Sequence, residues 1–186
     1  MKLSRDAIVD EAIALLQEEG LEAVSLRNVA ARLDAKAPSL ARHVGDKQSL
    51  LALMSARLFG AVIDALPPCT GWRDWVMAFG RGLWRKQQAT RDAAPLIAMA
   101  PLDADAMAAM ADRLRAQVQG VGLPVDRGML LQSAVQALVT GWTGFATGAQ
   151  GVAIGRIVPI EAAVEESLAA LVRGFAETLD PADPPR

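Results

Sequence analysis

The sequence has few of the residues on which catalytic and metal chemistry depends. Its 186 residues include one histidine, His43, one cysteine, Cys69, and no tyrosine. A single cysteine excludes an intrachain disulfide, and a single histidine leaves no cluster of histidine metal ligands. No group of carboxylates lies at metal-ligand spacing either. A helical enzyme is therefore a minor alternative, and we predict no enzymatic activity, no metal site and no cofactor.

Long hydrophobic runs are missing as well. The longest apolar stretch, Ala93 to Leu102, is interrupted by Pro95 and Pro101 and is shorter than the roughly 20 residues that a membrane helix needs. The first residues, MKLSRDAI, contain no apolar signal segment. We therefore expect a cytoplasmic protein with no membrane partner.

Net positive charge is absent from the whole chain but present in one short stretch. The formal charge is −2 and the pI is about 5.4, so no broad basic surface indicates a nucleic acid. Residues 25–47 nevertheless carry five basic residues against two acidic ones, a local charge of +3. The basic residues are Arg27, Arg32, Lys36, Arg42 and Lys47, and the acidic ones are Asp34 and Asp46. Such a cluster is usually a solvated face, but it can also neutralise DNA phosphates.

Two short helical patterns separated by a tight turn occupy this basic stretch. The first begins at Ser25, whose hydroxyl can cap a helix, and continues with apolar residues at helical spacing. Asp34 follows, and aspartate tolerates the left-handed conformation that a tight turn often needs. The pattern predicts a first helix that ends near Asp34.

The second pattern begins at Pro38, which suits the first position of a helix. Ala37 before it is a poor cap, so the first N–H groups would either bind a DNA phosphate or belong to a helix that frays. Leu40 and Val44 are four residues apart and would face inward. The outward set is then Ser39, Arg42 and His43, with Ala41 beside them. Two such helices are typical of a helix-turn-helix, whose second helix reads the major groove.

Residues 4–58 resemble the N-terminal domain of the Tet repressor family of bacterial transcription regulators. The matching pieces are SRDAIVDEAIALLQEEGLEAVSLRNVAARL, then APSLARHV, then DKQSLLALM. The resemblance implies DNA contacts from this helix-turn-helix, with Lys47 on a phosphate and Arg42 on a guanine edge. The implied DNA-binding residues are Arg27, Ala37, Pro38, Ser39, Ala41, Arg42, His43 and Lys47.

Two positions depart from the family pattern. The family usually carries an aromatic residue, most often tyrosine, where this chain has Ala41, and glycine where it has Asp34. Losing the aromatic side chain removes a phosphate or thymine contact, so the affinity or the operator preference is expected to differ. Neither change breaks the helical pattern.

Aromatic residues are confined to the rest of the chain. All four Trp and four Phe lie at or beyond Phe59, so the first part has no stacking platform for single-stranded nucleic acid. Core packing is the ordinary role of these residues, but Trp with Met also suits a pocket for apolar ligands. The resemblance implies DNA release when a small molecule fills such a pocket. Candidate pocket residues are Trp75, Phe79, Arg81, Trp84, Met99, Met107, Met110, Gln117, Gln136, Thr140 and Thr143. Tetracycline held through a histidine-bound Mg²⁺ is not expected, because His43 belongs to the DNA-binding part.

Two long apolar stripes predict a surface for a second copy of the chain. They lie on helices expected near 125–147 and 161–179, and the alternative is that both stripes only complete the core of one copy. Paired DNA-binding domains favour a dimer built as a four-helix bundle. The predicted interface residues are Leu131, Leu138, Trp142, Phe145, Val164, Leu168, Leu171 and Phe175.

These patterns predict an all-α protein of about nine helices. We expect a helix-turn-helix DNA-binding domain over residues 1–46, with the motif at about 25–44. A helical effector-binding and dimerisation domain over 47–180 follows, and a disordered tail over 181–186. Further helices are expected near 4–20, 46–66, 71–88, 92–99 and 103–119, with a flexible connection from Gly148 to Pro159.

The predicted function is that of a homodimeric regulator, a repressor released from a near-palindromic double-stranded operator by a small apolar effector. The alternative is a helical adaptor that reuses the fold without sequence-specific DNA binding.

Overall fold

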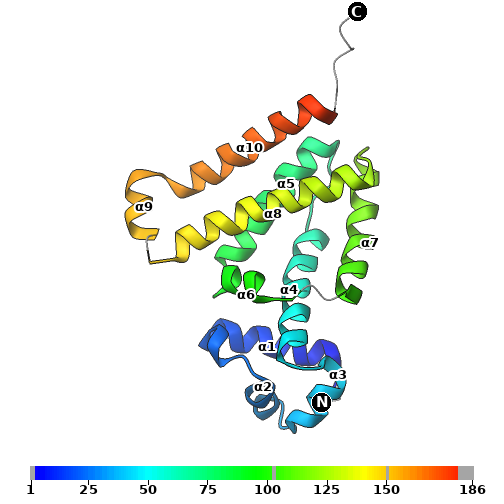
Figure 1. The fold of residues 1–186 in the computed structure, drawn as a ribbon, viewed down its shortest axis with the longest axis vertical. Coiled ribbons are helices and arrows are strands. Elements are labelled where there is room, and N and C mark those ends of the chain that lie inside the picture. The colour runs from blue at the N-terminus through cyan, green and yellow to red at the C-terminus, as the bar shows by residue number, and fades with distance from the viewer. Residues whose placement is uncertain (1–2, 102–103, 150, 180–186) are drawn as a thin grey trace, which may run out of the picture. The chain divides into compact units, whose positions relative to one another are not determined.

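The structure is a computed structural model that describes residues 3–101, 104–149 and 151–179. These residues form ten α-helices, one 3₁₀ helix and no strand, which confirms the all-α prediction (Figure 1). In chain order the elements are α1 (Arg5–Glu19), η1 (Leu21–Ala23), α2 (Leu26–Arg32), α3 (Ala37–Val44), α4 (Lys47–Asp64), α5 (Trp72–Gln88), α6 (Ala93–Met99), α7 (Ala104–Gly120), α8 (Val125–Thr147), α9 (Gly151–Ile157) and α10 (Ile160–Leu179). Within the described ranges, no helix is long and apolar enough to cross a membrane.

The chain divides into two compact units. The first unit contains Met1–Ala61 and Lys86–Met110, and the second contains Val62–Arg85 and Ala111–Arg186. The first unit therefore includes α6, which lies far along the chain from the other helices of that unit. This division does not follow the functional boundary expected after residue 46, and that boundary stays a prediction.

Side-chain caps begin α1 and α2, and the cap of α2 is the one that the sequence predicts. The Ala7 N–H donates to Ser4 Oγ at 3.2 Å, and the Asn28 N–H donates to Ser25 Oγ at 3.1 Å. Each bond satisfies an N–H group that has no partner inside its own helix. Between α2 and α3, Asp34 adopts the expected left-handed conformation with a φ of 49°.

The core of the first unit lies between α1, α2, α3 and the start of α4. It is built from aliphatic side chains on the inner faces of these helices, and Leu96 of α6 joins them with no exposed surface. The other buried members are Ile8, Val9, Ala12, Leu15, Leu16, Leu21, Val24, Val29, Ala30, Leu40, Val44, Leu50, Leu51, Met54 and Leu58.

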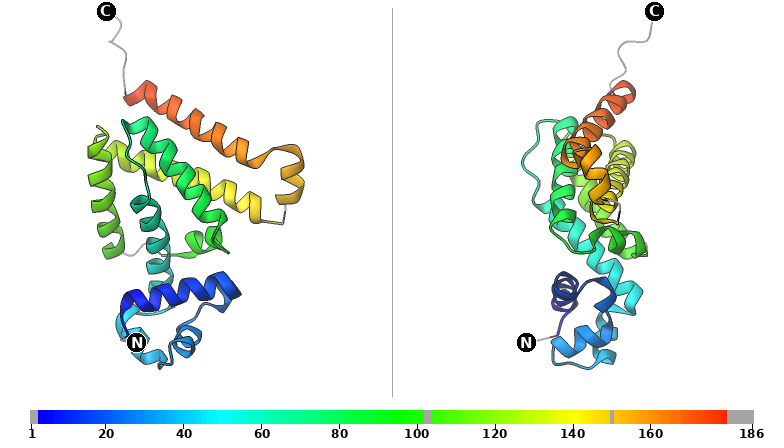
Figure 2. Two further views of the ribbon diagram at one scale, coloured as in Figure 1. Left: turned by 180° about the vertical axis from the view of Figure 1, so that it is seen from behind. Right: turned by 90° about the vertical axis from the view of Figure 1, so that its left-hand side faces the viewer.

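In the second unit, α8 and α10 lie side by side and are joined through α9 (Figures 1 and 2). α10 also approaches α5 closely at Gly80. A Cβ at Gly80 would lie 2.6 Å from Leu168 Cδ2, so any other residue there requires the Leu168 side chain to shift.

The prediction of a flexible connection from Gly148 to Pro159 is wrong, because Gly151–Ile157 forms helix α9. Glycines at 151 and 155 disfavour a helix by intrinsic propensity. The short helix is nevertheless held against α8, where Gly151 is buried and a Cβ would lie 2.4 Å from the Ala146 carbonyl oxygen. Packing against α8 thus overrides the local preference. The tail from 181 lies outside the described residues.

Candidate nucleic-acid interface

Helix α3 presents one apolar face and one polar face. Leu40 and Val44 are buried in the core of the first unit, as predicted. Arg42 is exposed on the opposite side, and Ser39 and His43 are half-buried at its edges. The buried pair fixes the rotation of the helix about its axis, so the side that carries Arg42 faces solvent.

The start of α3 has no side-chain cap. The N-cap residue is Lys36, one position earlier than the sequence suggested, and Pro38 occupies the second helical position. The Lys36 side chain has no acceptor with which to cap. Pro38 has no N–H, and the Ser39 N–H donates to the Lys36 carbonyl oxygen at 2.8 Å. The Ala37 N–H is therefore the first-turn donor that the missing cap leaves open. An N-terminus of this kind favours an anion such as phosphate.

Four basic residues on and beside α3 are not paired with acidic side chains. Within the parts of the chain that the structure describes, Arg27, Lys36, Arg42 and Lys47 form no ion pair, and all four are exposed. Against Asp34 and Asp46, four cations leave a local charge of +2.

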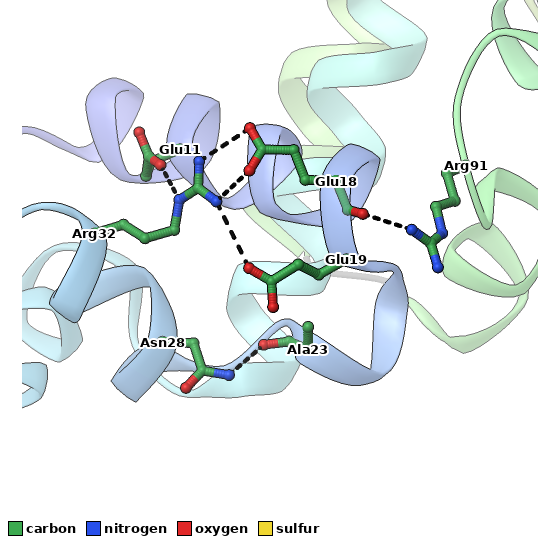
Figure 3. A network of polar contacts seen from close by, with 7 residues as sticks. All are labelled: Glu11, Glu18, Glu19, Ala23, Asn28, Arg32 and Arg91. Carbon is green, nitrogen blue, oxygen red and sulfur yellow. Dashed lines mark hydrogen bonds and ion pairs between the residues drawn. The ribbon is translucent and has the colours of Figure 1, made fainter.

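Arg32, the fifth basic residue of the stretch, has a structural role instead. Figure 3 shows its guanidinium among three glutamates of α1. It bonds Glu11, and Nη1 donates to Glu18 Oε2 at 2.6 Å. The pairing lowers the pKa of the Glu18 carboxyl and raises that of the guanidinium. Arg32 therefore attaches the end of α2 to α1. Because its guanidinium is engaged by these glutamates, it is not counted among the cations that could bind DNA phosphates.

Two contacts fix the far end of α3. Arg5 of α1 donates from Nε to the His43 carbonyl oxygen at 3.0 Å, and a cation at a helix C-terminus is favourable. Gly45 then turns the chain with a φ of 75°. Asp46 caps α4 by accepting the Ser49 N–H at 2.8 Å, a bond that lowers the pKa of its carboxyl. Lys47 is thereby placed at the first position of α4.

The predicted DNA-binding residues thus lie on α2, on α3 and at the start of α4. Ala41 is exposed on α3, at the position where the family usually carries tyrosine. Sequence reasoning missed Arg5 and the role of Arg32. An acidic stripe at Glu11 and Glu18, seven residues apart on one helix, was the available signal for Arg32. The DNA contacts themselves stay predictions.

The predicted pocket residues are distributed unevenly. Trp75 and Phe79 are buried in the second unit, with stacked rings whose centroids lie 5.4 Å apart. Trp75 Nε1 and Thr143 Oγ1 are buried without a hydrogen-bond partner among the described residues. Burying a polar atom without a hydrogen-bond partner lowers the stability of the fold, so such atoms are uncommon in proteins.

Other residues of the predicted pocket lie at the surface. Arg81 is exposed, and its guanidinium donates to both carboxylate oxygens of Glu165. This ion pair lowers the pKa of the Glu165 carboxyl. Met99 is 54% exposed and belongs to the first unit, and Gln117 is exposed on α7. Gln136, Thr140 and Trp84 are half-buried in the second unit. The side chains of Met107 and Met110 lie outside the described residues.

The predicted dimer residues divide into two sets. Leu131, Val164 and Leu168 are buried within the chain itself, so they pack in its own core as the alternative interpretation had it. The second set faces outward. It consists of Phe145, 52% exposed, with Leu138, Trp142, Leu171 and Phe175 half-buried. Leu130, which is 49% exposed, belongs with them.

No group of histidine, cysteine and carboxylate side chains that could hold a metal ion occurs among the described residues.

Comparisons with known proteins agree with this arrangement. The family described as bacterial regulatory proteins, tetR family, matches residues 8–54. An HTH-type transcriptional regulator of Saccharopolyspora erythraea is 39% identical over 77 residues, which are 41% of this chain and 33% of that protein. The class D tetracycline repressor protein of Escherichia coli is 30% identical over 90 residues, 45% of this chain and 41% of the repressor. The matches therefore span less than half the length of these curated relatives.

Solved structures match over nearly the whole chain. The TetR family protein ActR of Streptomyces coelicolor, in complex with (S)-DNPA, has a TM-score of 0.71 at 25% identity, covering 96% of this chain and all of that one. A TetR variant from Acinetobacter baumannii, in complex with minocycline, has a TM-score of 0.74 at 22% identity. The match covers 96% of this chain and 99% of that one. The second likeness concerns the fold alone. Residues 8–54 are thus similar to the tetR family of bacterial regulatory proteins, and the whole chain has the fold of solved TetR family proteins.

Proposed function

We propose that this protein is a transcriptional regulator, a homodimeric repressor that binds a near-palindromic duplex through α3 and releases it when a small, largely apolar molecule occupies the second unit. The observation that carries the proposal is the exposed face of α3. Arg42 projects from it, and the unpaired cations Lys36 and Lys47 flank it. Free cations supply the phosphate contacts, and a guanidinium on the exposed face can read a guanine edge.

The outward apolar side of α8 and α10 supports the dimer. Leu130 and Phe145 are about half exposed, and an exposed apolar side of this kind is typical of a protein interface. Gly141 and Gly174 have open space where a Cβ would stand, which permits a close approach of another helix. A two-fold axis through this surface pairs two copies of α3, as two half-sites about 34 Å apart require.

The second unit supports the effector. Trp75 Nε1 and Thr143 Oγ1 are buried polar atoms whose hydrogen-bonding capacity no described residue satisfies, and a ligand with a hydrogen-bonding group would satisfy either one. ActR and the Acinetobacter protein were each solved with a small molecule, and the Escherichia coli relative is a tetracycline repressor. These relatives favour an organic effector here too.

Selection of bound fragments from a randomised duplex library tests the DNA-binding role. We expect recovery of one near-palindromic sequence whose affinity falls with salt. Arg42→Ala should then cost about 1–3 kcal/mol and relax the preference at one base pair of each half-site. Arg115→Ala is the control, because Arg115 pairs with Asp112 within α7. Equal losses on selected and random duplexes would reduce Arg42 to a phosphate contact, and no selected sequence at all would favour the adaptor.

Two further measurements test the other parts of the proposal. Phe175→Glu should yield monomers in sedimentation, and an intact dimer would remove this surface from the interface. Native mass spectrometry of the purified protein should find a bound small molecule, at lower occupancy in Trp75→Phe, which keeps an aromatic ring at this position but removes the N–H group together with part of the indole. Trp72→Phe serves as the control, because Trp72 lies on the same helix and is not among the predicted pocket residues. A protein that is empty in every preparation would count against effector control.

A further inference from the structure

The end of α1 is held by a segment that lies about 70 residues later in the chain. Arg91 Nη1 donates to the Glu18 carbonyl oxygen at 2.6 Å, and the Arg91 N–H donates to Gln17 Oε1 at 3.0 Å. Gln17 Nε2 in turn donates to the Ala89 carbonyl oxygen at 3.2 Å. The Leu21 N–H, just past α1, donates to Asp92 Oδ2 at 2.8 Å. We call these four hydrogen bonds the α1 clasp.

The conformation of Asp92 indicates that the clasp is specific. Asp92 is the N-cap residue of α6, yet its carboxylate makes no bond to that helix and accepts from Leu21 instead. Its backbone is left-handed, with a φ of 52°, which is uncommon for a residue other than glycine. The opposite side is equally constrained, since a Cβ on Gly20 would lie 2.9 Å from Asp92 Oδ2. The Asp92 carboxylate therefore bonds the end of α1 and not the helix that it precedes, which indicates that this contact does more than begin α6.

The clasp is continuous with the contacts that hold the helix-turn-helix. Glu18 accepts from Arg91 through its backbone carbonyl and from Arg32 through its carboxylate (Figure 3). Arg32 is the last residue of α2, and α2 packs against α3. A single residue of α1 therefore joins the segment before α6 to the helix that precedes the DNA-reading helix.

We propose that Arg91 and Asp92 are positioning residues for DNA binding. They touch neither the exposed face of α3 nor its cations. They hold the end of α1, and through Glu18 and Arg32 they fix the placement of α2, against which α3 packs. Loss of the clasp leaves every phosphate-binding cation in place but lets α2 and α3 shift, and specific recognition suffers because base contacts tolerate little displacement. The inference rests on the DNA-binding role proposed for α3 and adds residues outside the matched stretch 8–54.

The test compares Arg91→Gln and Asp92→Gly with two controls, Arg115→Gln and Asp112→Ala. Glycine removes the oxygen that accepts from Leu21 and still adopts the left-handed conformation of residue 92. Each control removes the same charge from a pair that lies within α7. Binding is measured on the duplex that the wild type selects from a randomised library and on a scrambled duplex of equal length, over a series of salt concentrations. Amide hydrogen exchange over residues 26–44 is measured without DNA.

We expect the clasp variants to bind the selected duplex about 3- to 30-fold more weakly, with unchanged affinity for the scrambled duplex and an unchanged salt slope. Exchange over 26–44 should rise in the clasp variants and stay at the wild-type rate in the controls. A purely structural role would lower the folded fraction and leave the affinity of the folded protein unchanged, which would overturn the proposal.

Parallel losses on both duplexes, or exchange over 26–44 that does not change, would overturn it as well. The exchange measurement needs no DNA. If the wild type selects no sequence, the proposed function fails, while the clasp is still tested by exchange.

Discussion

Leu96 allows a direct test of whether α6 belongs to the first unit. Its side chain has no exposed surface and joins the core formed by α1 to α4, so Leu96→Ala removes a fully buried side chain. Such changes lower the free energy of unfolding by about 2–5 kcal/mol. With a urea dependence of about 2 kcal/mol per molar, the unfolding midpoint of the first unit should fall by about 1–2.5 M.

The tryptophans make the assay specific to one unit. All four, at positions 72, 75, 84 and 142, lie in the second unit, so their emission reports the unfolding of that unit alone. Amide exchange over residues 8–54 reports the first. Leu96→Ala should raise exchange over 8–54 and leave the tryptophan midpoint unchanged. Met99→Ala, at a position 54% exposed on the same helix, should change stability by no more than about 0.5 kcal/mol. A fall in the tryptophan midpoint with protected amides over 8–54 would refute the assignment of Leu96.

Three other changes have defined outcomes. Lys47→Ala should reduce the slope of log affinity against log salt by about one unit on every duplex, and an unchanged slope would exclude a phosphate contact. Gly80→Ala should lower the tryptophan midpoint by an amount equivalent to about 1–3 kcal/mol, because the new Cβ meets Leu168; a stable variant would mean that Leu168 can move. Acidification should destabilise the first unit, because the pKa values of the Glu18 and Asp46 carboxyls are lowered in the folded protein. Their contribution is complete above their ordinary pKa values and is lost as the pH falls through the folded-state values, so a urea midpoint of this unit that does not change between about pH 6 and about pH 3 would contradict the two pairings.

Local features of the first unit could be predicted because short-range chemistry determines them. The hydroxyl of Ser25 caps α2 as expected, the hydroxyl of Ser4 caps α1 in the same way, and Asp46 caps α4. Leu40 and Val44 are buried because their spacing gives α3 one apolar face. Each of these features depends on residues within about four positions of one another. The face of α3 that carries Arg42 follows from the same spacing.

Contacts between distant residues were beyond sequence reasoning. Arg32 was grouped with the other cations of its stretch, yet its partners lie 14 and 21 positions earlier on α1. The bond from Leu21 to Asp92 spans 71 positions, and no periodicity or capping signal indicates it. Helix α9 was missed for a related reason, since its glycines disfavour a helix until α8 supplies a surface to pack on.

The two-sided character of α8 explains why the predicted interface divided into two sets. Leu130 and Leu131 are neighbours in sequence, and successive residues of a helix point about 100° apart. Leu131 is fully buried in the chain's own core, whereas Leu130 is 49% exposed. A helix that is apolar on both sides needs two partners, and its own chain supplies one, through α10. Periodicity shows that such a helix is apolar, but only the packing of the chain shows which side is left over. Charge introduced at Leu130 should therefore act on association alone, whereas charge at Leu131 should unfold the second unit before association can be measured.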